Sequence, residues 1–208
     1  MSAQPRVFLV DDQAAVRKAL ARLLASAGFD VLALDSAQAF LDSDWEQASG
    51  CLVLDLSMPG MDGMALQRLL AERCSSLPLI FLTGQGDIAT GVQAMKLGAF
   101  DFLTKPVDDE RLIGAVTAAL ARNHEVRAQL AERKRLQTLV ASLTPREREV
   151  LELVVRGLMN KQVAAQLGTV EKTIKVHRAR VMEKMNVRSL AELVRLADRA
   201  GISSRVGE

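Results

Sequence analysis

The sequence predicts an α/β domain with a doubly wound, five-stranded parallel sheet, followed by a small all-α domain, with a long helix between them. Three observations support this fold class. Apolar runs alternate with helical patterns in the first half of the 208 residues, and helical patterns without strands fill the second half. Acidic residues dominate the first half and basic residues the second, which favours two domains with different partners.

Five short runs rich in Val, Ile, Leu and Phe are expected to form the sheet. They show little polar alternation, as parallel strands do when both faces of their sheet are covered. The runs are Arg6–Val10, Asp30–Leu34, 51–56, Leu79–Thr83 and 101–103. Because a helical pattern follows each run, five βα repeats are expected. Ligand sites of such sheets lie beyond the carboxyl ends of the strands, where the strand order reverses.

The helical patterns of the first half end at recognisable signals. Between the first two runs, Val16, Leu20 and Leu24 recur at helical spacing, and Gly28 provides the stop. Further helices are expected at Ala37–Leu41, 64–73, 87–97 (ending before Gly98) and from Asp108 onward.

A long helix is predicted over 108–141, because no proline lies between Pro106 and Pro145. Its later part is charged and lacks the sustained heptads of a coiled coil, and the pattern leaves open whether it is rigid or hinged. Thr144, Pro145 and Glu147 then form a helix-start signal. Four short helices are predicted at 145–156, 160–167, 171–185 and 189–200. The expected domains are 1–123 and 143–208, with a helical linker at 124–142.

The composition excludes several classes of protein. Residues 1–123 carry 10 basic and 15 acidic residues, whereas the rest of the chain carries 17 and 10, a split that chance alone can also produce. No apolar run approaches the ~20 residues of a membrane span and no secretory leader pattern opens the chain, so no membrane partner is expected. Cys51 and Cys74 lack the spacing of a zinc site or a disulfide framework, which fits a reducing, cytoplasmic setting.

Polar residues gather at the carboxyl ends of the predicted strands. Asp11 and Asp12 end the first strand, Asp55 lies near the end of the third, Thr83 ends the fourth and Lys105 follows the fifth. Each residue alone has a simpler explanation as a turn or strand residue, but all five meet at one sheet edge. Carboxylates there suit Mg²⁺, and a lysine with a hydroxyl completes a cradle for a transferring phosphoryl group.

The motifs around these residues resemble the receiver domain of bacterial two-component response regulators. They are VDD at 10–12, LDLSMPGMDG at 54–63, LTG at 82–84 and KP at 105–106. The resemblance covers residues 5–123 and implies a flavodoxin-like fold. It also implies that the domain takes a phosphoryl group from the phosphohistidine of a sensor histidine kinase.

The resemblance assigns the acidic residues their roles. Asp55 is expected to be the phosphoacceptor. Mg²⁺ is expected to be held by Asp12, Asp55 and the backbone carbonyl of Ser57, with Asp11 completing the acidic pocket. A carboxylate nucleophile splits phosphotransfer into covalent steps, and Mg²⁺ offsets the repulsion between the anionic reactants.

The resemblance also assigns the residues that respond to phosphorylation. Lys105 is expected to pair with the phosphoryl oxygens, and Thr83 to be the switch hydroxyl. Phe102 is expected to be the aromatic residue whose rotamer changes with Thr83. The peptide bond before Pro106 is often cis in this family, as the modest energy difference at proline allows.

Two other chemistries fit the sequence less well. Hydrolases of the haloacid-dehalogenase class also form an aspartyl-phosphate, but their motif is an Asp-x-Asp pair on one strand. Here Ser57 stands two positions after Asp55, so this chain does not match that motif. No Ser-His-Asp arrangement competes, because His124 lies in the linker and His177 in the helical domain. The chain is therefore not expected to be an enzyme, apart from Mg²⁺-dependent phosphorylation and dephosphorylation of its own receiver.

Residues 143–194 resemble the LuxR-type helix-turn-helix domain, so the whole chain is similar to response regulators of the NarL/FixJ type. Its GDI segment at 86–88 and its KP segment are closer to the FixJ branch. A short helix, a turn through Gly168 and a basic helix from 171 have helix-turn-helix spacing. Val176, Val181 and Met185 are expected to pack the basic helix on its neighbours, leaving the opposite face for the major groove.

Residues of the basic helix and its neighbour are candidate DNA contacts. Lys172, Thr173, Lys175, Val176 and Arg180 are expected near base edges or the adjoining backbone, and Lys161, His177, Arg178 and Lys184 at phosphates. Each of them alone also fits a solvated helix face. Where relatives often place a basic or amide reader, this chain has Ala179, so the DNA sequence preference is not predicted.

These features predict a transcription factor that is switched by phosphorylation of Asp55. Phosphorylation is expected to create a homodimer face around residues 87–112 and to place two basic helices in adjacent major grooves of a palindromic double-stranded DNA operator. RNA polymerase is a further expected partner. The alternative is a constitutive DNA-binding regulator whose receiver serves as a dimerisation module. The sequence does not identify the kinase, the signal, the target genes or the sign of regulation.

Overall fold

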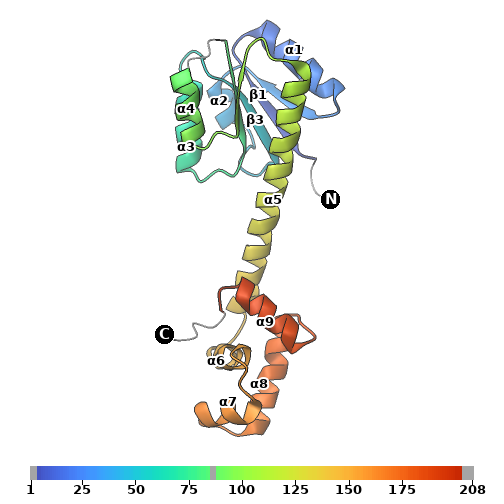
Figure 1. Ribbon diagram of the computed structural model, residues 1–208, viewed down its shortest axis with the longest axis vertical. Coiled ribbons are helices and arrows are strands. Elements are labelled where there is room, and N and C mark those ends of the chain that lie inside the picture. The colour runs from blue at the N-terminus through green and yellow to red at the C-terminus, as the bar shows by residue number, and fades with distance from the viewer. Residues whose placement is uncertain (1–3, 85–87, 203–208) are drawn as a thin grey trace. The chain divides into compact units, whose positions relative to one another are not determined.

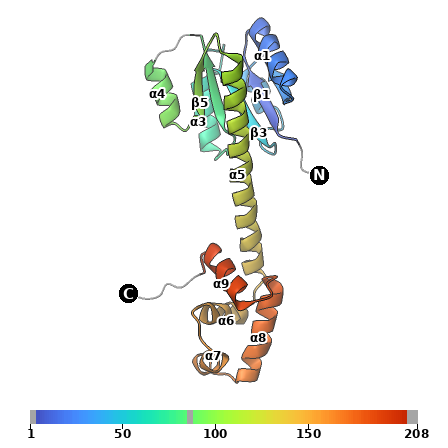
Figure 2. The same ribbon diagram turned by 45° about the vertical axis from the view of Figure 1, so that its right-hand side comes forward.

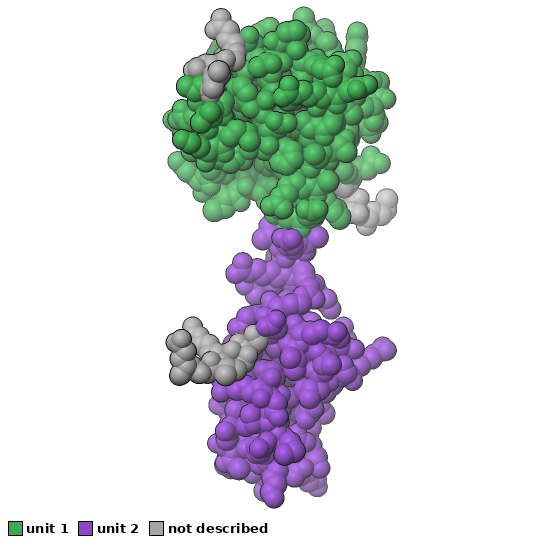
Figure 3. Space-filling view, viewed as in Figure 1, with its two compact units in different colours: residues 1–127 green, residues 128–208 purple. Residues whose placement is uncertain are grey.

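The computed structural model describes residues 4–84 and 88–202. The chain divides into two compact units, residues 1–127 and residues 128–208 (Figure 3). The α/β part lies in the first unit and the all-α part in the second. A single helix runs from Asp109 to Ala141 and shows no boundary at residue 124, so the separate linker at 124–142 stays a prediction. The start of the predicted 87–97 helix and most of the GDI segment lie outside the described residues.

Five parallel strands form the sheet of the first unit in the order β2-β1-β3-β4-β5, and Figure 1 shows β1 and β3 within this sheet. They are β1 (Arg6–Val10), β2 (Asp30–Leu34), β3 (Gly50–Asp55), β4 (Leu79–Thr83) and β5 (Asp101–Thr104). The order reverses between β1 and β3, which is the topological switch point of a doubly wound sheet. In the register of the sheet, Asp55 pairs with Leu82 and Thr83 with Thr104. The predicted strands are confirmed to within one residue.

Helices cover both faces of this sheet (Figure 2). One face carries α1 (Ala14–Ser26) and the first part of α5 (Asp109–Ala141), and the other carries α2 (Ala37–Leu41), α3 (Gly63–Glu72) and α4 (Ile88–Lys96). Successive side chains of β1 alternate between the two cores: Val7 and Leu9 face α1 and α5, whereas Phe8 and Val10 face the other helices. Because all four are fully buried, a slip of one residue would exchange the cores.

The described part of the second unit contains helices and the turns that join them, without strands. After the end of α5 come α6 (Pro145–Val155), α7 (Asn160–Gln166), α8 (Glu171–Lys184) and α9 (Leu190–Arg199), each within one residue of its predicted bounds. Their buried side chains form one core that includes Leu151, Ile174 and Val181. The turn between α7 and α8 passes through Gly168 at φ +61°, where glycine avoids backbone strain. None of the described helices is long and apolar enough to cross a bilayer.

One packing prediction for α8 is wrong. Val181 and Met185 are buried as expected, but Val176 is 47% exposed and Ile174 occupies the core position instead. The helical period explains this difference. Val181 and Met185 lie seven and eleven residues after Ile174 and share its face, whereas a residue two positions after Ile174 lies on nearly the opposite side.

Candidate functional site

Three carboxylates gather at the carboxyl edge of the sheet, at the switch point between β1 and β3. Asp11 and Asp12 follow β1, and Asp55 is the last residue of β3. One oxygen from each lies within 4.8 Å of the others. Asp11 is 0% exposed and Asp55 is 2% exposed. Because burial removes these carboxylates from water, their charges need compensation by nearby groups.

The Lys105 ammonium compensates part of this charge. Its Nζ lies 2.6 Å from Asp11 Oδ2 and 2.9 Å from Asp55 Oδ2. Burial opposes the charged ammonium, but hydrogen bonds and electrostatic attraction from both carboxylates outweigh burial and raise the pKa of Lys105. The Arg17 guanidinium binds the backbone carbonyls of Asp11 and Asp12 and not their carboxylates. Among the described residues, the Lys105 ammonium therefore contacts two of the three carboxylates.

The oxygen atoms of this pocket fit a divalent cation. Asp12 Oδ1 is buried and has no hydrogen-bond partner among the described residues. By contrast, Asp11 Oδ1 accepts a hydrogen bond from the Gln13 amide at 2.8 Å, and Asp55 Oδ1 accepts one from the Ser57 amide at 3.3 Å. Hard cations such as Mg²⁺ bind carboxylate and carbonyl oxygens. The surplus of carboxylates and the unpartnered oxygen therefore fit Mg²⁺.

The chain around Asp55 is packed closely against the start of α3. A Cβ atom on Gly63 would lie 2.7 Å from the carbonyl oxygen of Asp55 and 2.9 Å from the Phe81 ring. The carboxylate of Asp62 caps α3 by accepting a hydrogen bond from the Ala65 amide at 2.7 Å. Glycine at position 63 thus lets α3 begin directly against the end of β3, which holds the loop that follows Asp55.

Thr83 and Phe102 lie on neighbouring strands beside this pocket. Thr83 ends β4 and is 1% exposed, and Phe102 is a half-buried residue of β5 whose ring centroid lies 6.1 Å from that of Phe81. A Cβ atom on Gly91 of α4 would lie 3.4 Å from the Phe102 ring, so glycine leaves this ring room beside α4. The peptide bond from Lys105 to the following proline is cis, as the resemblance implies.

The predicted DNA contacts divide into exposed and half-buried side chains. The exposed ones are Lys161, Lys172, Lys175, Val176 and Arg180, and Thr173 is half-buried. The Nζ of Lys175 lies 3.1 Å from Glu171 Oε1, in a pair whose two side chains are both exposed. The solvent-facing side of α8 is therefore basic, as a helix that approaches DNA phosphates needs to be.

Three other predicted DNA contacts are half-buried within the second unit, and two of them bond to other side chains. Arg178 Nη1 donates a hydrogen bond to Asn160 Oδ1 at 3.1 Å and so joins α8 to the start of α7. The Nδ1 atom of His177 is buried and has no hydrogen-bond partner among the described residues. Lys184 Nζ lies 2.7 Å from Glu147 Oε2. These side chains have structural surroundings that the sequence pattern did not indicate.

Two buried polar residues were not identified from the sequence as long-range contacts. Asn123 of α5 is 1% exposed, accepts a hydrogen bond from the Gly50 amide at 3.0 Å and donates one to the Ser76 carbonyl at 3.0 Å. Glu147 is predicted as a capping residue, but its ion pair with Lys184 is not. No local pattern marks these contacts, because they join residues that are distant along the chain.

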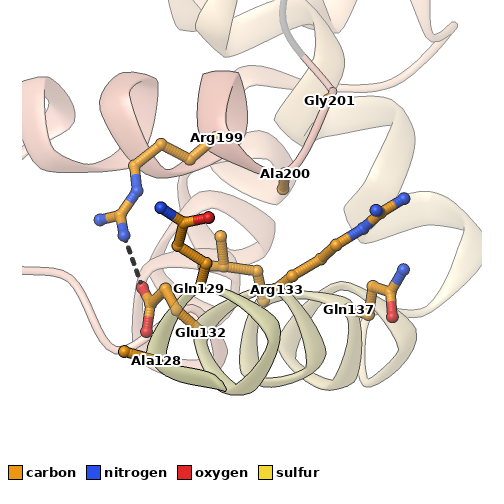
Figure 4. A pocket seen from close by; sticks show the side chains of 9 residues that line it. Ala128, Gln129, Glu132, Arg133, Gln137, Arg199, Ala200 and Gly201 are labelled. Carbon is orange, nitrogen blue, oxygen red and sulfur yellow. Dashed lines mark hydrogen bonds and ion pairs between the residues drawn. The ribbon is translucent and has the colours of Figure 1, made fainter. Parts of the chain in front are cut away.

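A hollow of about 680 Å³ lies within the second unit, between the later part of α5 and the end of α9 (Figure 4). Its walls include Gln129, Glu132 and Arg133 from α5, together with Arg199 from α9. Arg199 Nη2 reaches Glu132 Oε1 at 3.0 Å and ties the two helices together. None of the predicted site residues lines this hollow.

Comparison with known proteins assigns both units to known families. Residues 7–117 match the response regulator receiver domain, and residues 141–197 match the luxR family of bacterial regulatory proteins. The chain is 44% identical over 202 residues to the transcriptional regulatory protein FixJ of Bradyrhizobium diazoefficiens, covering 97% of this chain and 98% of FixJ. It is 46% identical over 198 residues to nodulation protein W of the same organism, covering 95% of this chain and 87% of that protein.

The same relationship appears among solved structures. The structure of the response regulator StyR has a TM-score of 0.91 and 48% identity to this chain, and the match covers 95% of this chain and 100% of StyR. A receiver domain and a LuxR-type domain imply a kinase partner and DNA binding. The chain belongs to the family of transcriptional response regulators in which a receiver domain precedes a LuxR-type DNA-binding domain.

Proposed function

We propose that Asp55 accepts a phosphoryl group from a sensor histidine kinase, and that this modification switches the binding of α8 to operator DNA. The observation that carries this proposal is the pocket at the switch point of the sheet, in which three carboxylates gather and the Lys105 ammonium contacts two of them. A pocket with surplus carboxylate oxygens suits an added cation and an added phosphoryl group. A purely structural cluster has no need of this surplus.

The side chain of Asp55 is held in place for this transfer. Its two oxygens contact the Ser57 amide and the Lys105 ammonium. Attack by a carboxylate oxygen forms an O–P bond and breaks the P–N bond of the phosphohistidine, whose electron pair returns to the imidazole. Because both reactants are anionic, catalysis consists mainly of positioning and charge neutralisation. Lys105 neutralises charge at Asp55 before transfer and pairs with the phosphoryl oxygens afterwards.

Asp12, Asp55 and the backbone carbonyl of Ser57 would hold Mg²⁺, with Asp11 in support. When bound, the cation supplies positive charge that reduces the repulsion between the carboxylate and the incoming phosphoryl group. The unpartnered Asp12 Oδ1 supports this assignment, because a buried carboxylate oxygen without a partner is costly.

Phosphorylation adds phosphoryl oxygens that Thr83 and Lys105 can contact, and such differential contacts bias a two-state surface. We expect the Thr83 hydroxyl to move toward the phosphoryl group and Phe102 to follow it, in the space that Gly91 leaves. The adjoining helix α4 exposes Val92 and Met95 at 49% and 46%. An exposed apolar surface of this kind supports a homodimer face around residues 87–112, of which the structure describes 88–112.

The dimer would place two α8 helices in adjacent major grooves of a palindromic operator and bring the regulator to RNA polymerase. Lys172, Thr173, Lys175, Val176 and Arg180 are the proposed contacts to bases or the adjoining backbone, and Lys161 and His177 are proposed phosphate contacts. Arg178 stays in this set as a weaker candidate, because it already binds Asn160.

The test is DNA binding with and without an acyl-phosphate donor and Mg²⁺, for the wild type and for Asp55→Asn. The probe is a duplex selected from a random pool with the wild-type chain, at fixed salt, because the electrostatic contribution changes steeply with salt. A donor-dependent gain in affinity that Asp55→Asn abolishes supports the switch. Equal binding under all conditions contradicts it and favours a constitutive regulator with a receiver used for dimerisation.

A further inference from the structure

Lys184 is the last residue of α8, and its ammonium lies against two other segments of the second unit. Its Nζ is 2.7 Å from Glu147 Oε2, in the first turn of α6, and 3.1 Å from the carbonyl oxygen of Ser142, which follows α5. Three segments therefore meet at one cation: the chain after α5, the start of α6 and the end of α8. Only 35% of the Lys184 side chain is exposed.

The carboxylate that receives Lys184 is itself fixed. Glu147 is 3% exposed, and its Oε2 also accepts a hydrogen bond from the Thr144 amide at 2.9 Å. The Thr144 hydroxyl in turn accepts a hydrogen bond from the Glu147 amide at 3.2 Å, which completes a capping box. Because the capping box already restricts the Glu147 side chain, the ion pair costs little further conformational entropy at that side chain.

The charge of this pair is also well compensated. The hydrogen bond from Lys184 and that from the Thr144 amide hold the pKa of Glu147 well below its usual range, at about 2. Removing either charged partner would leave the other without its counter-charge, and for the buried carboxylate this is strongly unfavourable. Such a pair is typical of a structural role, whereas a phosphate contact requires an ammonium that is free to turn toward DNA.

We propose that Lys184 is a positioning residue for DNA binding, which holds the end of α8 against α6 and the chain after α5 and does not contact a DNA phosphate. This inference rests on the DNA-reading role proposed above for α8. The pair fixes the end of α8, while the Arg178–Asn160 hydrogen bond fixes the middle of the helix against α7. The basic side chains of α8 depend on both contacts for their direction.

The test compares Lys184→Met and Glu147→Gln in the full chain, with Lys161→Met as the matched control, because Lys161 is exposed and is a proposed phosphate contact. The readout is the affinity for the selected duplex at several salt concentrations. We expect Lys184→Met and Glu147→Gln to weaken binding similarly, on the order of tenfold, because a displaced α8 loses the equivalent of one base contact. The double variant should lose no more than either single variant.

The salt dependence separates positioning from phosphate contact. A lost phosphate contact reduces the slope of log affinity against log salt by ~0.9. We expect this reduction for Lys161→Met and an unchanged slope for Lys184→Met. A reduced slope for Lys184→Met, together with wild-type affinity for Glu147→Gln, would overturn the inference.

Lysine acylation of the wild type gives a second readout that does not depend on the folding of a variant. We expect Lys184 to react slowly and equally with and without the duplex, and Lys161 to become protected only when the duplex is bound. Protection of Lys184 that appears only with DNA would overturn the inference while leaving DNA binding established. Failure of the wild-type chain to enrich any duplex from the random pool would instead overturn the proposed function of α8.

Discussion

Each unit of the chain places a lysine ammonium on a buried carboxylate, but only the second unit balances the charges. In the first unit, Lys105 serves two aspartates while Asp12 Oδ1 stays unpartnered among the described residues. In the second unit, the Lys184 ammonium pairs with the Glu147 carboxylate, which also takes part in a capping box. The first arrangement leaves an unpartnered oxygen and surplus negative charge for a cation, whereas the second pairs one carboxylate with one ammonium. A buried polar group without a partner thus indicates a site that binds a ligand, whereas a buried group whose charge is paired indicates a structural role.

The largest effect is expected from removing the cation of the first pocket. Lys105→Met should lower the rate of phosphorylation by an acyl-phosphate donor about 100-fold, because a positioned charge near the reacting oxygens is lost. The measurement is the fraction of phosphorylated chain over time, resolved by phosphate-affinity electrophoresis. Thermal unfolding serves as the folding control. A rate close to that of the wild type would show that Lys105 plays only a structural role.

The close contact behind Asp55 can be tested with two glycines. Gly63→Ala should destabilise the first unit by about 1–3 kcal/mol, because its Cβ would meet the Asp55 carbonyl oxygen at 2.7 Å. Gly114→Ala is the matched control: it lies within α5, a Cβ there meets nothing within 4 Å, and alanine should stabilise the helix by about 0.5–1 kcal/mol. Denaturant unfolding followed by the fluorescence of Trp45 reports both changes. A stabilisation by Gly63→Ala like that expected for Gly114→Ala would contradict the packing argument.

The balanced pair of the second unit should make its stability depend on acid. Because the pKa of Glu147 is lowered to about 2, its contribution is fully present above its unfolded value of roughly 4.3 and is lost as the pH falls toward 2. Methyl NMR of Val181 and Met185 during urea unfolding of the full chain measures this change. We expect the dependence between these pH values to become shallower in Glu147→Gln. An identical dependence in the variant would show that other groups carry it.

The smallest effect on stability is expected on the exposed face of α8. Lys175→Ala breaks an exposed pair with Glu171 and should change stability by less than about 0.5 kcal/mol. It should nevertheless weaken binding to the selected duplex and relax its preference at one or two base pairs. Competition binding against substituted duplexes measures this preference. Equal losses on selected and random DNA would make Lys175 a phosphate contact.

Much of this organisation is predictable from local patterns in the sequence. Apolar runs and stop signals give the strands and helices to within one residue, because a parallel sheet and a helical core impose different periods on the chain. The strand order then brings Asp11, Asp55 and Lys105 together, since the carboxyl ends of parallel strands share one edge. Their contacts confirm that the predicted pocket assembles, while their chemical roles stay predictions.

The parts that were not predicted depend on contacts between distant segments. The sequence pattern of α8 does not distinguish Lys184, which is paired, from Lys172, which is exposed, since both are basic residues of one helix. The prediction that Val176 lies in the core is wrong because the pattern does not fix the rotation of a short helix with few apolar residues. Asn123 carries no motif, and its role follows only from the two backbone segments that it joins.

The central proposal, that the unbalanced pocket is the place of phosphorylation, can be tested most directly by locating the phosphoryl group. The wild-type chain is treated with an acyl-phosphate donor and Mg²⁺, the acyl phosphate is reduced with borohydride, and the modified residue is identified by peptide mass spectrometry. We predict modification at Asp55, and none when Mg²⁺ is removed by a chelator. Modification at another residue, or equal modification without Mg²⁺, would contradict the proposal.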